Sequence, residues 1–361
     1  MAGINETTLC KETVTGRTMS RHTDNIIVVG AGGIGGTVAG FLARAGEKVT
    51  VVDKSVPHIE AIRARGLLVD GVFGELRPTF EQTLFPEELK SPLEIVILAV
   101  KSQNTEEALA TIAPLLSDHG VIVSLQNGLN ASRIAERVGP SRTIGAMVHM
   151  VADHVGPGHV SRFTEGEFTI GELDGRKTDR IQQIAARLSR AVPTHVTDNI
   201  WGYIWAKQIY SCLLVATALV DAPSSEMLNP EWAKRIFVAL MGEAAEAALA
   251  EGINLEKYDR LDPRIMLVRK KEDLPGAFDI LPTGSAKGNS GIWRDIKIRH
   301  RKTETEFLTG DVARIGRKHG LPMTINSQVT QMVKEIEEGR RPMSWDNLRS
   351  LEKAANERLP R

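Results

Sequence analysis

The chain has 361 residues, 42% hydrophobic and 25% charged, a typical composition for a globular protein with room for two domains. Its 45 Lys and Arg residues balance 45 Asp and Glu residues, so it lacks the basic excess on which nucleic-acid binding depends. Because the chain has only two cysteines, Cys10 and Cys212, and no apolar run longer than 212–220, we expect a cytoplasmic protein with no disulfide and no membrane span.

Strand and helix patterns alternate through the first half of the chain. Residues 1–23 are Thr-rich and lack the apolar core of a signal peptide, so we expect a disordered extension there. The apolar runs that follow predict buried parallel strands, and segments with helical spacing separate them. The predicted strands are 26–29, 49–52, 95–100, 121–125, 142–150 and 163–171, the last two separated by Gly-Pro-Gly-His at 156–159; the predicted helices are 34–45 and 105–116. This order predicts an α/β fold, a Rossmann-type doubly wound sheet, over residues 24–197.

The second half of the chain has helical patterns throughout. Asp198 is placed to cap the first of these helices, and residues 256–285 are rich in Pro, Gly and charge, which predicts irregular structure. The predicted helices are 199–219, 230–252, 288–319 and 325–338. We therefore expect a C-terminal all-helical domain over 198–345 for substrate binding and dimerisation, and a C-terminal tail over 346–361. A ligand cleft should lie between the domains, at the carboxyl ends of the strands.

Five glycines stand within Gly30–Gly36, directly after the first strand. Gly30, Gly32 and Gly35 form G-x-G-x-x-G, in which the first glycine permits a tight turn. The second lets a pyrophosphate approach the backbone, and the third lets the helix pack closely on the strand. The motif alone is only a weak signal, but here it lies between a predicted strand and a predicted helix. The pattern therefore predicts a dinucleotide site with its phosphates at the helix N-terminus.

Asp53 ends the second predicted strand, where an acidic side chain accepts hydrogen bonds from the adenosine ribose. A carboxylate there would repel a 2′-phosphate, which favours NAD. Lys54, Arg63 and Arg65 follow closely and could hold that phosphate, so NADP stays possible. The other interpretation of Asp53 is a solvated turn residue.

Several motifs, in this order, resemble the ketopantoate reductase (2-dehydropantoate 2-reductase) family from about residue 24 to about 340. They are VGAGGIGG (29–36), ILAVKSQNTEEAL (97–109), SLQNGLN (124–130), GPGHVSRF (156–163), WAK (205–207) and KTETEFLTG (302–310). The resemblance implies a Rossmann domain followed by a helical domain, and reduction of a 2-keto acid by a nicotinamide cofactor. It also implies a homodimer through the helical domain.

The resemblance also implies roles for individual residues. Lys207 in WAK matches the catalytic lysine, and Glu304 matches the glutamate that helps bind substrate and holds that lysine. Lys101 and Asn127 match residues at the cofactor side of the cleft. Ser290 is a weaker match for a substrate-binding serine, because the segment after it is one residue longer than in the family.

Chemistry supports a lysine in that role, because a cation can stabilise and protonate the oxygen of a carbonyl that receives a hydride. Partial burial would lower the lysine pKa towards neutrality. Lys207 could instead extend to the surface along its stem, and Glu304 could belong to an ordinary solvated helix face. The family's asparagines one and two turns after the lysine are replaced here by Ser211 and Val215. A serine can still bind substrate, whereas a valine favours an apolar group over a hydroxyl.

The leading hypothesis is an NAD(P)-dependent oxidoreductase that transfers a hydride between nicotinamide and a 2-keto or 2-hydroxy acid related to ketopantoate, without a metal ion. The alternative is a non-catalytic NAD(H)-binding regulator of the same fold, which would not need Lys207 and Glu304. An S-adenosylmethionine methyltransferase shares the glycine-rich turn but explains neither the helical half nor the WAK lysine.

Overall fold

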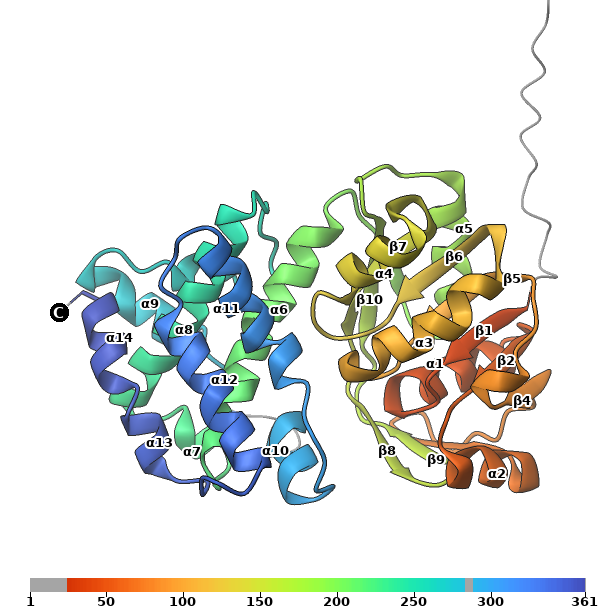
Figure 1. Ribbon diagram of the computed structural model, residues 1–361, viewed down its shortest axis with the longest axis horizontal. Coiled ribbons are helices and arrows are strands. Elements are labelled where there is room, and N and C mark those ends of the chain that lie inside the picture. Colours follow the sequence, from red (N-terminus) through yellow and green to blue (C-terminus); the bar gives the residue numbers. More distant parts are fainter. Residues whose placement is uncertain (1–24, 283–287, 361) are drawn as a thin grey trace, which may run out of the picture.

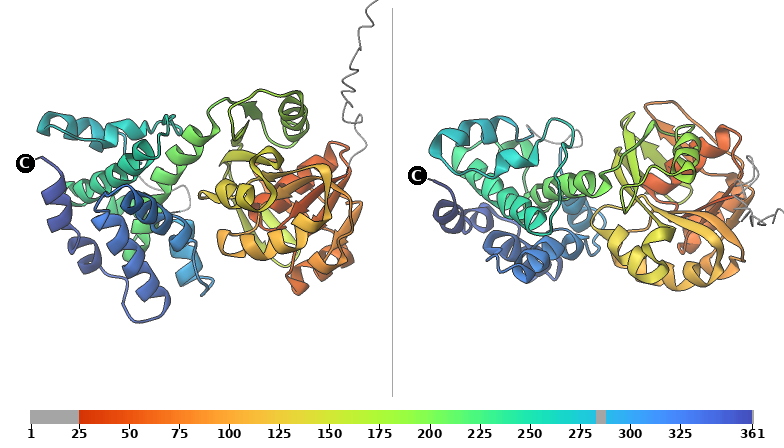
Figure 2. Two further views of the ribbon diagram at one scale, coloured as in Figure 1. Left: turned by 45° about the horizontal axis from the view of Figure 1, so that its top comes forward. Right: turned by 90° about the horizontal axis from the view of Figure 1, so that it is seen from above.

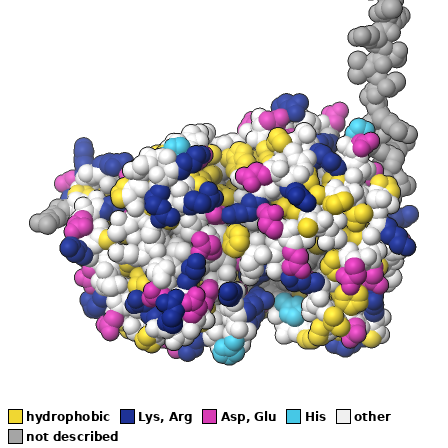
Figure 3. Space-filling view, viewed as in Figure 1, with side chains coloured by type: hydrophobic (Ala, Val, Ile, Leu, Met, Phe, Trp, Pro, Cys, Tyr) yellow, Lys and Arg dark blue, Asp and Glu magenta, His cyan; other side chains and the backbone are white. Residues whose placement is uncertain are grey.

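The computed structural model describes residues 25–282 and 288–360, so the extension predicted over 1–23 and Cys10 lie outside the described residues. A sheet domain and a helical domain lie side by side, and Figure 2 shows that the long helix α6 reaches from one to the other. Basic and acidic side chains are intermixed on the face seen in Figure 3, as the balanced charge implies. Within the described ranges, no helix has both the length and the hydropathy needed to cross a membrane.

The sheet domain has the doubly wound architecture that the alternating pattern predicts (Figure 1). Its eight strands follow the order β11-β10-β7-β6-β5-β1-β2-β4, and all neighbours are parallel except β7 and β10. The strands are β1 (Ile26–Val29), β2 (Val49–Val52), β4 (Gln82–Leu84), β5 (Leu93–Leu98), β6 (Leu116–Ser124), β7 (Thr143–His149), β10 (Glu167–Glu172) and β11 (Thr194–Val196). The helices of this domain are α1 (Gly33–Arg44), α2 (Val56–Arg65), α3 (Thr105–Ile112), α4 (Asn130–Val138) and α5 (Asp179–Leu188).

A second, three-stranded sheet of β3 (Leu68–Gly71), β9 (His159–Arg162) and β8 (Ala152–Gly156) packs against α1. The predicted break at 156–159 is therefore the turn of a β8–β9 hairpin rather than a simple gap between two long strands. The contact is close, because a Cβ on Gly33 would lie 2.7 Å from the backbone nitrogen of Asp153. The hairpin thus fixes the start of α1 from outside the main sheet.

The helical domain surrounds one large apolar core. Its helices are α6 (Ile200–Ala216), α7 (Ser224–Met227), α8 (Glu231–Ala250), α9 (Leu274–Asp279), α10 (Gly291–Lys297), α11 (Thr309–Lys318), α12 (Thr324–Glu337), α13 (Trp345–Arg349) and α14 (Glu352–Arg358). The helix predicted over 288–319 is interrupted between Lys297 and Thr309, where His300 adopts a φ of +48° that a right-handed helix does not allow. The tail predicted over 346–361 includes α14, which packs on α8 and buries Leu351 and Ala355 completely.

The helix α6 belongs to both domains. Its first turns pack on β7 and β10, where Cβ atoms on Gly145 and Gly171 would lie 2.9 and 2.8 Å from Ile200 side-chain atoms. Its later turns pack on α8 and α12, and Cys212 is buried there as a free thiol. The helix therefore places its middle turns, with Lys207, at the boundary between the domains.

Candidate active site

A cavity of about 1210 Å³ lies between the domains. Its first wall is formed by residues at the carboxyl ends of β1, β2, β5, β6 and β7, which confirms the predicted position of the cleft. The second wall comes from α6, α10 and the segments around 258–261 and 299–304. The cavity therefore joins residues that the sequence separates by up to 279 positions, from Val29 to Leu308, into one site of the size that cofactors and substrates need.

The three motif glycines face different surroundings at the turn from β1 to α1. Gly30 has a φ of +97°, and a Cβ there would lie 2.7 Å from the backbone nitrogen of Val100. A Cβ on Gly35 would lie 1.9 Å from the Gly30 carbonyl oxygen, so this glycine is needed for packing. A Cβ on Gly32 would meet nothing within 4 Å, and Gly32 lines the cavity. No side chain caps the N-terminus of α1 at Gly32. The first backbone N–H groups of this helix therefore face the open space beside Gly32, where they could bind a pyrophosphate.

Asp53 lies beside this turn and fixes its geometry. One carboxylate oxygen accepts a hydrogen bond from the Ala31 amide and the other from the Ser55 amide, both at 2.8 Å. A carboxylate has further lone pairs, so Asp53 can still accept from ribose hydroxyls at the cavity wall.

The sequence analysis missed His58, which is buried beside the glycine turn. Its Nδ1 accepts a hydrogen bond from the Gly158 amide at 2.9 Å, so its Nε2 carries the proton and donates to the Ala31 carbonyl at 2.9 Å. The His154 ring lies 3.1 Å from the same Nδ1. No sequence motif marks this histidine, because its partners come from the turn and from the β8–β9 hairpin.

The basic residues near the adenosine side all have partners in the fold. Lys54 forms an ion pair with Glu107 at 2.6 Å, and Arg65 donates to the Pro157 carbonyl at 2.8 Å. Arg63 forms an ion pair with Glu88. A 2′-phosphate would therefore have to compete with these contacts.

Glu304 and Lys101 form an ion pair across the cavity between the two domains. Lys101 follows β5 and Glu304 precedes α11. Lys101 Nζ lies 2.7 Å from one Glu304 oxygen and 3.4 Å from an Asp295 oxygen. The other Glu304 oxygen accepts from the Ser102 amide at 3.0 Å and from the Ser102 hydroxyl at 2.8 Å. Burial lowers the pKa of Lys101, but Glu304 and Asp295 outweigh it and the pKa is raised overall. The family resemblance led us to expect Glu304 to hold Lys207, whereas the structure pairs it with Lys101 and Ser102.

Lys207 lies on the part of α6 that faces the cavity. Its ammonium donates a hydrogen bond to the Val148 carbonyl at the end of β7. Burial lowers the pKa of Lys207 to about 8, and the negative charge of Glu304 opposes this shift in part. The lysine is therefore a cation near neutral pH that can release a proton at moderate cost.

The prediction that Val215 faces the substrate from the next turns of α6 is wrong. The cavity is lined by Tyr210, Ser211 and Leu214, whereas Val215 is completely buried in the helical core and does not line it. The reason is helix phase: seven residues end about 20° short of two full turns from Lys207, whereas eight overshoot by about 80°. The Ser211 hydroxyl does line the cavity, but it donates to the Lys207 carbonyl at 2.9 Å.

The two remaining predicted residues also line the cavity. Ser290 caps α10, and its hydroxyl accepts a hydrogen bond from the Trp293 amide at 3.2 Å. Asn127 is exposed at the cavity wall, and its backbone carbonyl accepts from Asn130 at 2.6 Å. The cavity is thus lined by all the predicted site residues except Gly35, which is taken up by packing against the Gly30 carbonyl.

Sequence reasoning also missed an ion network that joins the domains. Arg294 donates to Asp153 of β8 at 3.0 Å, and Arg299 pairs with both Asp153 and Asp295. Arg301 pairs with Asp295 at 2.8 Å. Four cations, counting Lys101, thus meet three carboxylates, counting Glu304, along the cavity. The run of charges at 294–304 gave no signal of these partners, because a solvated helix has the same composition.

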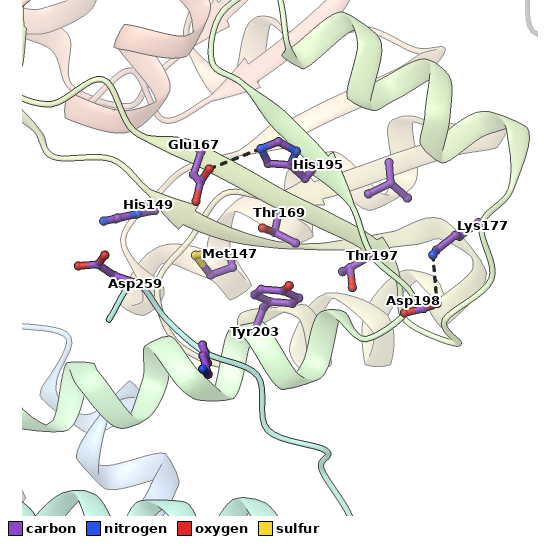
Figure 4. A pocket seen from close by; sticks show the side chains of 12 residues that line it. Met147, His149, Glu167, Thr169, Lys177, His195, Thr197, Asp198, Tyr203 and Asp259 are labelled. Carbon is purple, nitrogen blue, oxygen red and sulfur yellow. Dashed lines mark ion pairs between the residues drawn. The ribbon is translucent and has the colours of Figure 1, made fainter. Parts of the chain in front are cut away.

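A smaller pocket of about 240 Å³ shares His149 and Asp259 with the cavity, and Tyr203 of α6 projects there toward Met147 and Thr169 (Figure 4). Ion pairs of Glu167 with His195 and of Lys177 with Asp198 cross it, at 3.5 and 3.1 Å (Figure 4). Over residues 25–282 and 288–360, no group of three or more His, Cys, Asp or Glu side chains could hold a metal ion. The pocket contains none of the predicted site residues.

Comparison with known proteins gives a consistent result over most of the chain. The family model described as "Ketopantoate reductase PanE/ApbA" matches residues 26–175, and its C-terminal counterpart matches residues 199–337. A 2-dehydropantoate 2-reductase from Pyrococcus horikoshii is 29% identical over 315 residues, which cover 86% of this chain and 97% of that relative.

Solved structures share the fold. A PanE/ApbA family ketopantoate reductase from Ralstonia eutropha JMP134 has a TM-score of 0.75 and 26% identity, covering 88% of this chain and 99% of its own. A D-mandelate dehydrogenase with NADH and anilino(oxo)acetate has a TM-score of 0.77 and 22% identity, with the same coverage.

Proposed function

The chain belongs to the ketopantoate reductase (PanE/ApbA) family, and from this premise we propose that it is an NAD(P)-dependent oxidoreductase. It transfers a hydride between nicotinamide and a 2-keto or 2-hydroxy acid related to ketopantoate and pantoate. The observation that carries the proposal is Lys207, a half-buried cation with a pKa of about 8 that lines the same cavity as the open glycine turn.

The residues present fit a nicotinamide dinucleotide. Gly32 leaves open space at the N-terminus of α1 for the pyrophosphate, and Asp53 can accept from the adenosine ribose. Asn127 and Lys101 lie further along the cavity, where the nicotinamide half would extend. When bound, NAD(H) supplies or accepts the hydride.

Lys207 performs the proton transfer in this proposal. Its ammonium donates a hydrogen bond to the substrate carbonyl oxygen and gives up a proton as negative charge develops there. In the oxidation direction the neutral amine takes the proton from the substrate hydroxyl. The hydrogen bond to the Val148 carbonyl orients the amine, and a pKa of about 8 allows transfer in both directions near neutral pH.

The ion network supplies the attraction for a carboxylate. The four cations Lys101, Arg294, Arg299 and Arg301 exceed their three acidic partners, and Lys207 adds a further positive charge. An anionic 2-keto acid would therefore be drawn to the half of the cavity that holds Lys207. Ser211 and Ser290 are the hydroxyl groups that we propose for contacts with its polar atoms.

We propose NADH as the preferred cofactor. Asp53 would repel a 2′-phosphate, and Lys54, Arg63 and Arg65 are already engaged with protein partners. The ratio of kcat/KM for NADH and NADPH measures this preference. A clear preference for NADPH would mean that these basic side chains exchange their partners for the phosphate.

The proposed function is tested by mixing the full chain with NADH and a set of 2-keto acids and following the absorbance of reduced nicotinamide. Steady consumption of NADH that depends on the 2-keto acid supports the enzyme. Tight binding of NADH without turnover on any of them supports the alternative, a non-catalytic NAD(H)-binding regulator. The homodimer stays a prediction that light scattering of the purified chain can test, and the cytoplasmic location also stays a prediction.

A further inference from the structure

The proposed function does not specify the group that the 2-keto acid carries beside its carbonyl. We infer that this group is a bulky apolar one, an aromatic ring or a branched chain without a hydroxyl, held against α6 by Tyr210 and Leu214. The inference rests on the proposed function, because it concerns the same cavity and the same carbonyl.

The first argument is the narrow strip of α6 that reaches the cavity. Lys207, Tyr210, Ser211 and Leu214 line it, at the spacing of residues i, i+3, i+4 and i+7 on one helix face. Leu214 lies about two turns from Lys207, which corresponds to roughly 10 Å along the helix. A substrate whose carbonyl oxygen contacts Lys207 therefore extends its substituent past Tyr210 and Ser211 towards Leu214.

The second argument is an aromatic wall beside this strip. The Tyr210 and Tyr258 rings lie 5.2 Å apart between centroids, and the Tyr258 and His149 rings lie 5.2 Å apart. His149 directly follows Val148, whose carbonyl accepts the hydrogen bond from Lys207. Burial raises the pKa of both tyrosines, so both phenols are neutral at physiological pH. Flat uncharged faces at this spacing suit contact with another ring or a branched aliphatic group.

The third argument is the apolar lining that the helical domain adds. Leu261 and Ile292 are buried core residues that also line the cavity, and Leu214 and Ile280 pack partly buried against the same core. The cavity thus opens onto the edge of an apolar core on the side away from the glycine turn.

The fourth argument is the state of the Ser211 and Ser290 hydroxyls and the character of Leu214 beside them. The Ser211 proton is used in a hydrogen bond to Lys207, and the Ser290 oxygen accepts from the Trp293 amide. Leu214 itself offers no hydrogen bond, so a substrate hydroxyl placed against it would lose its water without replacement from that side chain, which is costly. The site therefore selects against a hydroxylated substituent such as that of ketopantoate.

The experiment compares kcat/KM with NADH for four 2-keto acids. Phenylglyoxylate and 4-methyl-2-oxopentanoate carry large apolar groups, ketopantoate carries a hydroxyl, and pyruvate carries only a methyl group. We expect both large apolar substrates to exceed ketopantoate and pyruvate by about tenfold or more, since a well-filled apolar pocket discriminates on this scale.

Variants locate the preference in the cavity. Leu214→Asn should lower the ratio of phenylglyoxylate to ketopantoate by about tenfold. The matched control is Leu249→Asn, which makes the same chemical change at an exposed leucine of α8 outside the cavity and should leave all the ratios unchanged. Leu214→Ala keeps the site apolar, so it should weaken the large substrates without improving ketopantoate, and it serves if the Asn variant fails to fold. Tyr210→Phe and Tyr258→Phe should preserve the preference, because the rings rather than the hydroxyls make the contact.

The outcomes separate the two proposals. If the wild-type chain reduces ketopantoate as efficiently as phenylglyoxylate and 4-methyl-2-oxopentanoate, the apolar substituent is wrong while the proposed function stands. If the Leu214 variants leave every ratio unchanged, the assignment to α6 is wrong. If the chain binds NADH but reduces none of the four acids, the proposed function fails and the inference fails with it.

Discussion

Lys101 and Lys207 line one cavity from two regions of the molecule, the end of β5 and the middle of α6, and their surroundings differ in one respect. Lys101 lies 2.7 Å from Glu304 and 3.4 Å from Asp295, whereas Lys207 contacts the Val148 carbonyl and, among the described residues, forms no ion pair. Burial lowers the pKa of both lysines, but the carboxylates reverse this shift at Lys101. The partner therefore decides which lysine can exchange a proton near neutral pH, and the residue type alone does not.

The largest expected effect comes from removing Lys207, which pairs with no carboxylate among the described residues. Lys207→Ala should lower turnover by roughly 10²–10⁴-fold, the usual contribution of a positioned proton donor, with little change in NADH affinity. Steady-state kinetics and calorimetric titration with NADH measure the two quantities. Lys353→Ala on α14 is the control, because that side chain is exposed far from the cavity. Near-normal turnover in a folded Lys207→Ala protein would show that Lys207 is not the proton donor and would contradict the difference drawn between the two lysines.

The second effect separates cofactor binding from the chemistry of either lysine. Gly32→Val should weaken NADH binding by roughly 10–100-fold, because its side chain would fill the space left for the pyrophosphate. The protein should still fold, since Gly32 has a φ of −67° and a Cβ there meets no neighbour. Gly276→Val introduces the same side chain at another open glycine, on α9, and should bind NADH normally. Unchanged affinity in Gly32→Val would remove the turn from the cofactor site.

The third test is the pH profile of the wild-type chain. Reduction needs the cationic form of Lys207, which is present below its pKa and lost above it. We expect kcat/KM for reduction to be level at neutral pH and to fall about tenfold per pH unit above about 8, while oxidation of the hydroxy acid rises over the same range. Lys101 cannot cause this fall on the alkaline side of the profile (the alkaline limb), because its pKa is raised. A limb that persists in Lys207→Arg at the same pH would assign it to another group.

The smallest expected effect acts on both lysines through one carboxylate. Glu304→Gln removes the negative charge that raises the pKa of Lys207, so the alkaline limb should move to lower pH. It also weakens the contact with Lys101, and we expect a rise in the substrate KM. The control Glu306→Gln changes an exposed carboxylate that pairs with Lys334, and its profile should match the wild type. An unchanged pH profile in Glu304→Gln would show that the charge of Glu304 does not influence the pKa of Lys207.

The sequence predicts the parts of the site that depend on neighbours along the chain. Gly30, Gly32, Gly35 and Asp53 lie within one strand–turn–helix–strand unit, so spacing is enough to place them at the turn, although Gly30 and Gly35 also face Ala99 after β5. The position of Lys207 on a buried helix likewise follows from the apolar pattern around it.

The remaining features of the site depend on contacts between distant segments of the chain or on the exact direction of a side chain around the axis of α6. The partners of Glu304 lie about 200 residues away, and Arg294 and Arg299, which pair with Asp153, lie about 140 residues away from it. Nothing in the local composition distinguishes these buried charges from a solvated face. The prediction for Val215 is wrong by one residue of helix phase, because eight residues overshoot two turns by about 80° and turn that side chain into the core.

The helix α6 has a consequence for how the whole chain unfolds. Its first turns complete the packing of β7 and β10, and its last turns form the centre of the helical core. Neither domain can lose its structure without exposing apolar surface of the other, and the ion pairs of Asp153 cross the same boundary. Heat or denaturant should therefore melt the molecule in one cooperative transition instead of two, and a chain divided at residue 198 should yield two fragments that each expose part of a core.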